Sequence, residues 1–375
     1  MSFFERALKK PDGRDLFLYS TREIPEGIVA TAPRGDAVSP KPQMRWHPLR
    51  AEWVVFASHR QNRTFLPPKD YSPLAVTKSA EFPTEMPAGD YEVAVFENLF
   101  PSLRTEGNRA ELQEVYPGVP AGTADGRCEV IVFTEDPDTS LADLPLERIR
   151  LILDVIAERT RALGARNDIQ YVLPFENRGV EMGVTLHHPH GQLYAYPFVP
   201  PVPAKMLESM RTYHKKHGRG LLEDLISQEM KDGRRVIVED AKTALAGAIS
   251  FVPAFARYPY ETWVAPKRAH AFLHDLDSEE RDSLARVLKA TLEKHDALWN
   301  RPQPYLMVLY QAPLDGEAHP EAHVHFEIYP PYRTKDKLKY LAGTELGGGL
   351  FINDSIPEEK AAELRMAGVT KGGPR

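Results

Sequence analysis

Three histidines stand within four positions of the segment VTLHHPHGQLY (184–194), and a proline separates the last two. In a strand, side chains two positions apart lie on one face, so His188, His190 and Gln192 are expected to share a face. The intervening proline has no backbone N–H to pair there, and Gly191 allows another group to come close to the backbone. The segment therefore predicts that imidazole, amide and backbone groups converge on one spot.

Three kinds of site could use this arrangement. A structural metal site needs more ligands, and the single cysteine, Cys128, cannot supply a thiolate-rich zinc centre. A histidine cluster without chemistry would satisfy its nitrogens by packing and hydrogen bonding. In the third kind, a neutral imidazole attacks phosphorus through one nitrogen while an acceptor holds the proton on the other, and Gln192 donates to the developing anion. We favour the third, because a phosphorylated histidine is reactive enough to pass its group on.

The longer segment FENRGVEMGVTLHHPHGQLYAYPFVPP (175–201) strongly resembles the active-site segment of the galactose-1-phosphate uridylyltransferase family, within the histidine-triad superfamily. Three other segments also resemble that family. They are RWHPLRAEWVVFASHRQNRTFLPP (45–68), VFENLFPSL (95–103) and YPPYRTKDKLKYLAGTEL (329–346). The resemblance runs from about residue 44 to the end of the chain.

The resemblance implies an enzyme in which His190 is the nucleophile, His188 supports it and Gln192 holds the phosphoryl oxygens. His190 would take UMP from UDP-glucose, release glucose 1-phosphate, and pass the UMP to galactose 1-phosphate, as in galactose metabolism. This is ping-pong catalysis through a covalent uridylyl-histidine, and it needs no organic cofactor. An ADP-sugar or dinucleoside-polyphosphate phosphorylase of the same superfamily is the alternative enzyme, and a nucleotide sensor without turnover is the alternative from another class.

Substrate-binding positions also follow from the resemblance. They are Arg60 and Arg63 for the nucleotide phosphates, Phe96, Asn98 and Phe100 for uridine, Asn177, Gly183 and Thr185 for the phosphoryl group, and Lys339, Tyr340, Thr344 and Glu345 for the hexose and its phosphate. In the family the two arginines and the last segment come from the neighbouring subunit, so a homodimer with shared active sites is implied. Leu99 stands where some members have an acidic residue that could meet the ribose, which leaves the ribose contact open.

Two metal sites of the family are altered in this sequence. Many members bind zinc through Cys-x-x-Cys, a separate histidine and the first histidine of His-Pro-His. The matching positions here are Ser72, Ala75 and Pro137, so only His188 remains and we expect no zinc there. A second family site uses one glutamate and three histidines. The weaker candidates for it are His319, His323, His325 and Glu327, which we interpret as a degenerate partner of the catalytic strand.

The elements around these motifs are arranged in two similar halves. Apolar residues at helical spacing predict long helices over 145–165 and 277–299, the second capped by Asp277 or Ser278. EVIVF (129–133) matches ETWVA (261–265), and the two His-x-His strands match further along, which suggests an old duplication. We predict an α+β fold of two tandem histidine-triad-like halves, with mixed or antiparallel sheets flanked by long helices.

The expected domains are an N-terminal extension (1–44), an N-terminal half with the HHPHGQ strand (45–202) and a C-terminal half with the HVHFE strand (203–375). The polar residues 1–45 are expected to wrap the surface or a partner subunit. The 375 residues carry a formal net charge of −6, which argues against a nucleic-acid partner. No apolar run is long enough to span a membrane, and the charged N-terminus is no secretory signal, so we expect a cytoplasmic protein.

Overall fold

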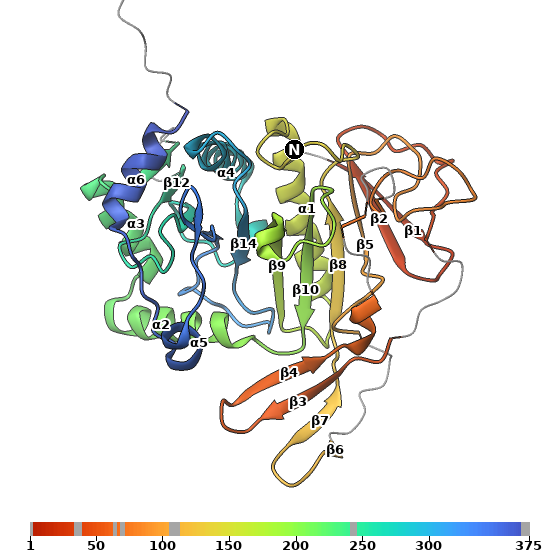
Figure 1. Ribbon diagram of the computed structural model, residues 1–375, viewed down its shortest axis with the longest axis horizontal. Helices are drawn as coiled ribbons and strands as arrows, with labels where there is room; N and C mark the ends of the chain where they lie inside the picture. The colour runs from red at the N-terminus through yellow and green to blue at the C-terminus, as the bar shows by residue number, and fades with distance from the viewer. Residues whose placement is uncertain are drawn as a thin grey trace, which may run out of the picture.

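The structure is a computed structural model that describes residues 3–33, 40–62, 66–67, 72–104, 113–240 and 246–368. Within these residues, eleven strands form one sheet in which all neighbours run antiparallel (Figure 1). In spatial order the strands are β1 (Phe4–Lys9), β2 (Asp15–Ser20), β5 (Val93–Glu97), β8 (Arg127–Val132), β10 (His190–Tyr196), β9 (Tyr171–Arg178), β14 (Tyr305–Tyr310), β15 (His325–Tyr329), β13 (Thr262–Pro266), β12 (Ala248–Phe251) and β11 (Val236–Glu239).

The order of these strands has an internal two-fold symmetry. β9 and β14 pair at the centre, where Glu176 lies opposite Met307. Outward from this pair, β10, β8 and β5 on one side mirror β15, β13 and β12 on the other. The two His-x-His segments therefore lie in equivalent places, as the predicted duplication requires. The α+β organisation in two similar halves is confirmed.

Helices cover the sheet and connect its strands. They are α1 (Leu146–Gly164), α2 (Pro201–His217), α3 (Leu221–Asp232), α4 (Ser278–Leu298), α5 (Gly343–Gly348) and α6 (Pro357–Met366), with short 3₁₀ turns η1 (Ser58–Asn62), η3 (Val180–Met182) and η4 (Leu273–Asp275). Both predicted long helices are present. The Asp277 side chain accepts from the Glu280 N–H at 2.9 Å, and the Glu280 carboxylate accepts from the Asp277 N–H at 3.0 Å, so the predicted cap is confirmed as a capping box.

The two long helices pack side by side on one face of the sheet (Figure 1). Their apolar residues, such as Ile149, Ile152 and Leu288, join strand residues from both halves in one core cluster. On the opposite face the halves differ. In the C-terminal half, Leu222 and Ile226 of α3 pack against Phe251 there, whereas the same face of the N-terminal half carries an open pocket.

Residues 4–20 form the hairpin β1–β2, which extends the main sheet through the pairing of β2 with β5. The prediction that residues 1–45 wrap the surface is therefore wrong for this part. Leu16 and Leu18 are fully buried against Phe96, and this burial fixes β2 at the sheet. The sequence analysis missed β2 because its short alternating run directly follows the charged turn KPDGR (10–14).

A smaller sheet stands at one end of the molecule (Figure 1). It contains β4 (Glu52–Phe56), β3 (Gln43–His47), β7 (Pro120–Thr123) and β6 (Gln113–Glu114), and a separate ribbon pairs β16 (Tyr332–Thr334) with β17 (Lys337–Leu338). Of the helices formed by the described residues, none has the length and apolar character needed to cross a membrane.

Candidate active site

A pocket of about 210 Å³ lies on the open face of β5, β8 and β10. It gathers seven of the residues predicted for the site. They are Arg60, Phe96, Asn98, Phe100, Thr185, His190 and Gln192. Apolar residues such as Leu74 and Leu186 complete the wall. The pocket therefore joins an apolar wall to the imidazole and amide groups that sequence reasoning selected for phosphoryl chemistry.

The protonation pattern of His190 is fixed by the backbone. Its Nδ1 lies 2.7 Å from the main-chain carbonyl oxygen of His188, and a carbonyl can only accept, so Nδ1 carries the proton. The other nitrogen, Nε2, has no hydrogen-bond partner among the described residues. Burial lowers the pKa of His190, which favours the neutral ring. A neutral imidazole with a free Nε2 lone pair in a pocket is the arrangement of a nucleophile.

His188 supports this geometry in a different way from the one expected. Strand β10 begins at His190, so residues 184–189 are not strand and the two histidines do not share a strand face. Pro189 cannot donate to a sheet ladder, which ends the strand there. His188 is only 2% exposed, and its Nε2 donates to the Thr134 carbonyl at 2.7 Å. The ring anchors the loop, and the main-chain carbonyl of His188 orients His190.

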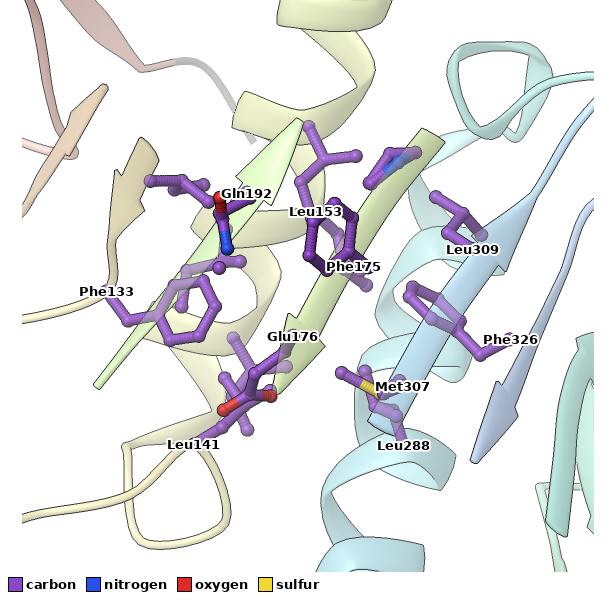
Figure 2. Close-up of a pocket in the computed structure, with 16 residues that line it drawn as sticks. Phe133, Leu141, Leu153, Phe175, Glu176, Gln192, Leu288, Met307, Leu309 and Phe326 are labelled. Atoms are coloured by element: carbon purple, nitrogen blue, oxygen red, sulfur yellow. The ribbon is translucent and has the colours of Figure 1, made fainter. Parts of the chain in front are cut away.

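Gly191 faces the core side of β10. A Cβ atom at this position would lie 2.9 Å from the Phe133 ring and 3.1 Å from the Phe175 carbonyl oxygen. Behind it is an apolar cavity of about 30 Å³, which Figure 2 shows between the sheet and the helices, with Phe133, Leu153 and Met307 on its walls. The groups that come close to the backbone of Gly191 are thus core residues. The residue lets β10 sit deep enough to present its two neighbours to the pocket.

Gly191→Ala is expected to lower the free energy of unfolding by about 1–3 kcal/mol, because the added methyl overpacks a closed site. Chemical denaturation followed by circular dichroism would measure this. Gly347→Ala is the matched control, since Gly347 lies in α5 with open space around it and should lose no stability. Equal stability of Gly191→Ala and the wild type would contradict the packing argument.

The remaining phosphate residues lie around the pocket. Arg60 donates through Nη1 to the Phe100 carbonyl at 2.9 Å and to the Tyr194 hydroxyl at 3.2 Å, so it lines the pocket of its own chain. The implied supply of Arg60 by a neighbouring subunit is therefore not needed here. Arg63 lies outside the described residues. Asn177 donates to the Met182 carbonyl at 3.1 Å, and Gly183 has a φ of +74°, so both shape the loop before the histidines without lining the pocket.

The segment predicted for the hexose is not brought to this pocket by the same chain. Among the described residues that line the pocket, Lys339, Tyr340, Thr344 and Glu345 are absent. Lys339 lies 3.3 Å from the Glu345 carboxylate. The same carboxylate accepts from the Thr344 hydroxyl and from backbone N–H groups, and these hydrogen bonds lower the pKa of Glu345 to about 2. Tyr340 is 78% exposed. This ordered segment with an exposed ring is available to another chain.

Three of the four positions that match the family's zinc ligands come together. Ser72, Pro137 and His188 line one small pocket, where His188 Nδ1 is buried without a partner among the described residues. One nitrogen and one serine hydroxyl do not make a zinc site, which needs four N, S or carboxylate ligands. The residues present therefore do not fit zinc. In the described part of the chain, no three His, Cys, Asp or Glu residues are placed to hold a metal ion.

The second His-x-His strand repeats the hydrogen-bond geometry of the first, but its histidines do not face an open pocket. His323 Nε2 donates to the Pro266 carbonyl at 2.8 Å, and His325 Nδ1 donates to the His323 carbonyl at 2.8 Å. Here, however, His325 Nε2 lies 3.1 Å from the Glu327 carboxylate, and α2 residues such as Met206 cover the site. His319 pairs instead with Asp315 and Glu321. The metal candidates of this half are thus separated into different interactions.

The comparisons with known proteins cover both halves. Residues 36–200 match the family model "Galactose-1-phosphate uridyl transferase, N-terminal domain", and residues 206–371 match that of its C-terminal domain. The galactose-1-phosphate uridylyltransferase of Thermotoga maritima is 36% identical over 324 residues, covering 86% of this chain and 98% of that protein. The enzyme of the same name from Streptomyces lividans is 34% identical over 364 residues, covering 94% of each chain.

Solved structures give the same picture. A uridylyltransferase structure aligns with a TM-score of 0.74 and 33% identity, covering 86% of this chain and 97% of that one. An ADP-glucose phosphorylase from Arabidopsis thaliana, with ADP-glucose bound, aligns with a TM-score of 0.65 and 25% identity, covering 88% and 100%. The predicted fold class is confirmed by these likenesses.

Proposed function

The chain belongs to the galactose-1-phosphate uridylyltransferase family, and from this we infer that it exchanges UMP between UDP-glucose and galactose 1-phosphate, giving glucose 1-phosphate and UDP-galactose. It is a transferase that acts on a UDP-sugar and a sugar phosphate. The resemblance read from the HHPHGQ segment is confirmed. The cytoplasmic location stays a prediction.

We propose that the reaction passes through a covalent uridylyl-histidine at His190. Nε2 attacks the α-phosphorus of UDP-glucose, a new P–N bond forms, and the bond to the β-phosphate oxygen breaks, so glucose 1-phosphate leaves. Galactose 1-phosphate then attacks the same phosphorus and returns the electron pair to Nε2. Gln192, on the same face of β10, can donate to the phosphoryl oxygens. The observation that carries this proposal is the His190–His188 hydrogen bond, which leaves Nε2 free in the pocket.

We also propose that the active enzyme is a homodimer in which residues 339–345 of one chain complete the pocket of the other. Two observations support this. The segment holds its own shape through Glu345 yet does not line the pocket of its chain, and the Tyr340 ring is exposed beside it. The pocket itself lacks a Lys or Arg other than Arg60 among its described lining residues, so the charge for a second phosphate would have to come from elsewhere.

Intact-protein mass spectrometry tests the reaction. After incubation with UDP-glucose alone, the protein should gain the mass of one UMP, and adding galactose 1-phosphate should remove it and produce UDP-galactose. An adduct that forms from ADP-glucose, and that inorganic phosphate rather than galactose 1-phosphate removes, would instead identify an ADP-sugar phosphorylase. An absence of any adduct, with turnover intact, would contradict the covalent histidine.

A further inference from the structure

Glu85 lines the nucleotide pocket, although nothing in the sequence motifs points to it. The residue is 4% exposed, and only one of its two carboxylate oxygens receives hydrogen bonds from the described residues. Lys10 Nζ and Arg14 Nη2 both donate to Oε2, each at 2.9 Å. The second oxygen, Oε1, receives no hydrogen bond from the described residues. Glu85 thus presents an unused acceptor in the wall of the pocket.

The charges around Glu85 are balanced and fixed. Lys10 also donates to the carbonyl oxygens of Glu85 and Thr31, at 2.6 and 2.8 Å, so its three hydrogens are committed. Arg14 binds Asp12 through Nε and Nη2, at 2.8 and 2.6 Å. Two cations therefore face two carboxylates in a buried cluster. An ionised carboxylate held in this way can only accept hydrogen bonds, and its orientation is set before a ligand arrives.

Glu85 lies at the end of the pocket away from the nucleophile. Gln192 of β10, Val130 of β8 and Phe96 of β5 are directly paired across neighbouring strands. Two strand spacings separate Gln192 from Phe96, which is about 10 Å. Lys10, the partner of Glu85, stands 4.8 Å above the centre of the Phe96 ring. A nucleotide joined to His190 through its phosphorus places the ribose next and the base last, so the base reaches this end.

We propose that Glu85 Oε1 accepts a hydrogen bond from N3–H of the bound uracil and thereby selects uracil over cytosine. This rests on the proposed function, because it takes the ligand to be a UDP-sugar attached at His190. Uracil carries a donor at N3, whereas neutral cytosine carries an acceptor there, and a carboxylate facing that lone pair is repelled. A buried group built to pair with a substrate N–H rejects analogues that lack it, since the group is then left unpaired.

The two cations that bind Glu85 lie outside the part of the chain that the family model matches, whereas Glu85 itself lies inside it. Lys10 and Arg14 flank the β1–β2 turn, and the matched region begins at residue 36. The hairpin that extends the sheet therefore also brings two cations to the pocket wall. This gives the N-terminal extension a role in substrate choice.

The first half-reaction tests the assignment with three sugar nucleotides: UDP-glucose, CDP-glucose and 2′-deoxy-UDP-glucose. The rate of nucleotide adduct formation is measured by mass spectrometry for the wild type, Glu85→Gln and Glu97→Gln. Glu97 is the matched control, because it is the carboxylate next to Phe96 but points to the other face of β5, toward Arg127. We expect Glu85→Gln to lower the UDP-glucose rate about 10- to 100-fold and to reduce the preference for UDP-glucose over CDP-glucose by a similar factor. Glu97→Gln should change neither.

Two results would overturn the assignment. One is an unchanged preference for UDP-glucose over CDP-glucose in Glu85→Gln. The other is a loss of the penalty for removing the 2′-hydroxyl, which would make Glu85 a ribose contact. If Glu85→Gln fails to fold because it leaves an excess of buried positive charge, Lys10→Met/Glu85→Gln restores neutrality and carries the same expectation. A wild type that forms no UMP adduct would instead reject the proposed function, so the two failures are distinguishable.

Discussion

Replacing His190 with glycine should abolish the UMP adduct and lower the rate of UDP-galactose formation by about 10⁴-fold or more, the scale seen when a covalent nucleophile is removed. The reason is geometric. Within the part of the chain that the structure describes, His190 Nε2 is the imidazole nitrogen of this pocket that is left free, because the other nitrogen donates to the His188 carbonyl. Mass spectrometry with UDP-glucose and a coupled assay for UDP-galactose measure the two effects.

His187→Gly is the matched control for this experiment. His187 is an exposed histidine three positions earlier, and it lies outside the pocket, so its removal should leave both readouts close to those of the wild type. Thermal unfolding of both variants checks that the glycine itself does not remove the fold. An adduct that persists in folded His190→Gly would place the nucleophile elsewhere.

The comparison of the two halves indicates why one strand is reactive and the other is not. Both strands fix Nδ1–H of the second histidine on the carbonyl of the first, at 2.7 and 2.8 Å. The difference lies two residues further on, where Gln192 faces the open pocket and Glu327 instead binds His325 Nε2 at 3.1 Å. A carboxylate at that position contacts Nε2, the nitrogen that is free in the first strand, and it would repel a phosphate. The duplicated strand thus keeps its backbone geometry while its reactive atom is occupied.

The parts of the fold that carry strong local patterns were predictable from the sequence. The helix after Asp277 has both a capping box and a regular apolar stripe, and the structure places its start where the sequence did. The duplication could be predicted because EVIVF (129–133) matches ETWVA (261–265) and a His-x-His segment follows each of them. The order of the strands in the sheet reflects this duplication. In such elements, local propensity, hydrophobic pattern and packing all favour the same structure, so the structure can be predicted from the sequence.

Where tertiary contacts decide the backbone, the sequence was less informative. VTLHHP was expected to be strand, but Pro189 stops the ladder and β10 begins one residue later. β2 is a short strand beside a charged turn, and only its burial against β5 makes it part of the sheet. Context of this kind overrides local preference.

The candidate site shows the same division. His190, Gln192 and Phe96 lie in recognisable motifs, and the fold brings them into one pocket. Glu85 was missed, since it stands in a proline-rich loop without periodicity and meets Lys10 only through a contact 75 residues apart in the chain. A carboxylate in such a loop gives no signal until the hairpin that pairs with it is placed.

The shared active site gives the second large effect, which appears only when two chains are combined. His190→Gly and a segment variant, Lys339→Met/Tyr340→Ala, should each be inactive by themselves. Co-expressed with different tags, they should regain about one quarter of the wild-type activity, because random pairing makes half of the dimers mixed and each mixed dimer has one intact site. Turnover of the co-expressed sample, and about half of wild-type activity in the purified mixed dimer, are the measurements.

The matched control combines His190→Gly with Gln192→Ala. Both residues belong to the same strand of the same chain, so a mixed dimer contains no intact site and should stay inactive. If the segment variant likewise fails to restore activity, residues 339–345 serve their own chain, and the exposed Tyr340 ring has another purpose. If it succeeds, the distance between this segment and the pocket within one chain is explained, since the second phosphate group would meet Lys339 only across the subunit boundary. The pocket of each chain would then supply the nucleophile and the base contacts, and its partner the contacts to the hexose phosphate.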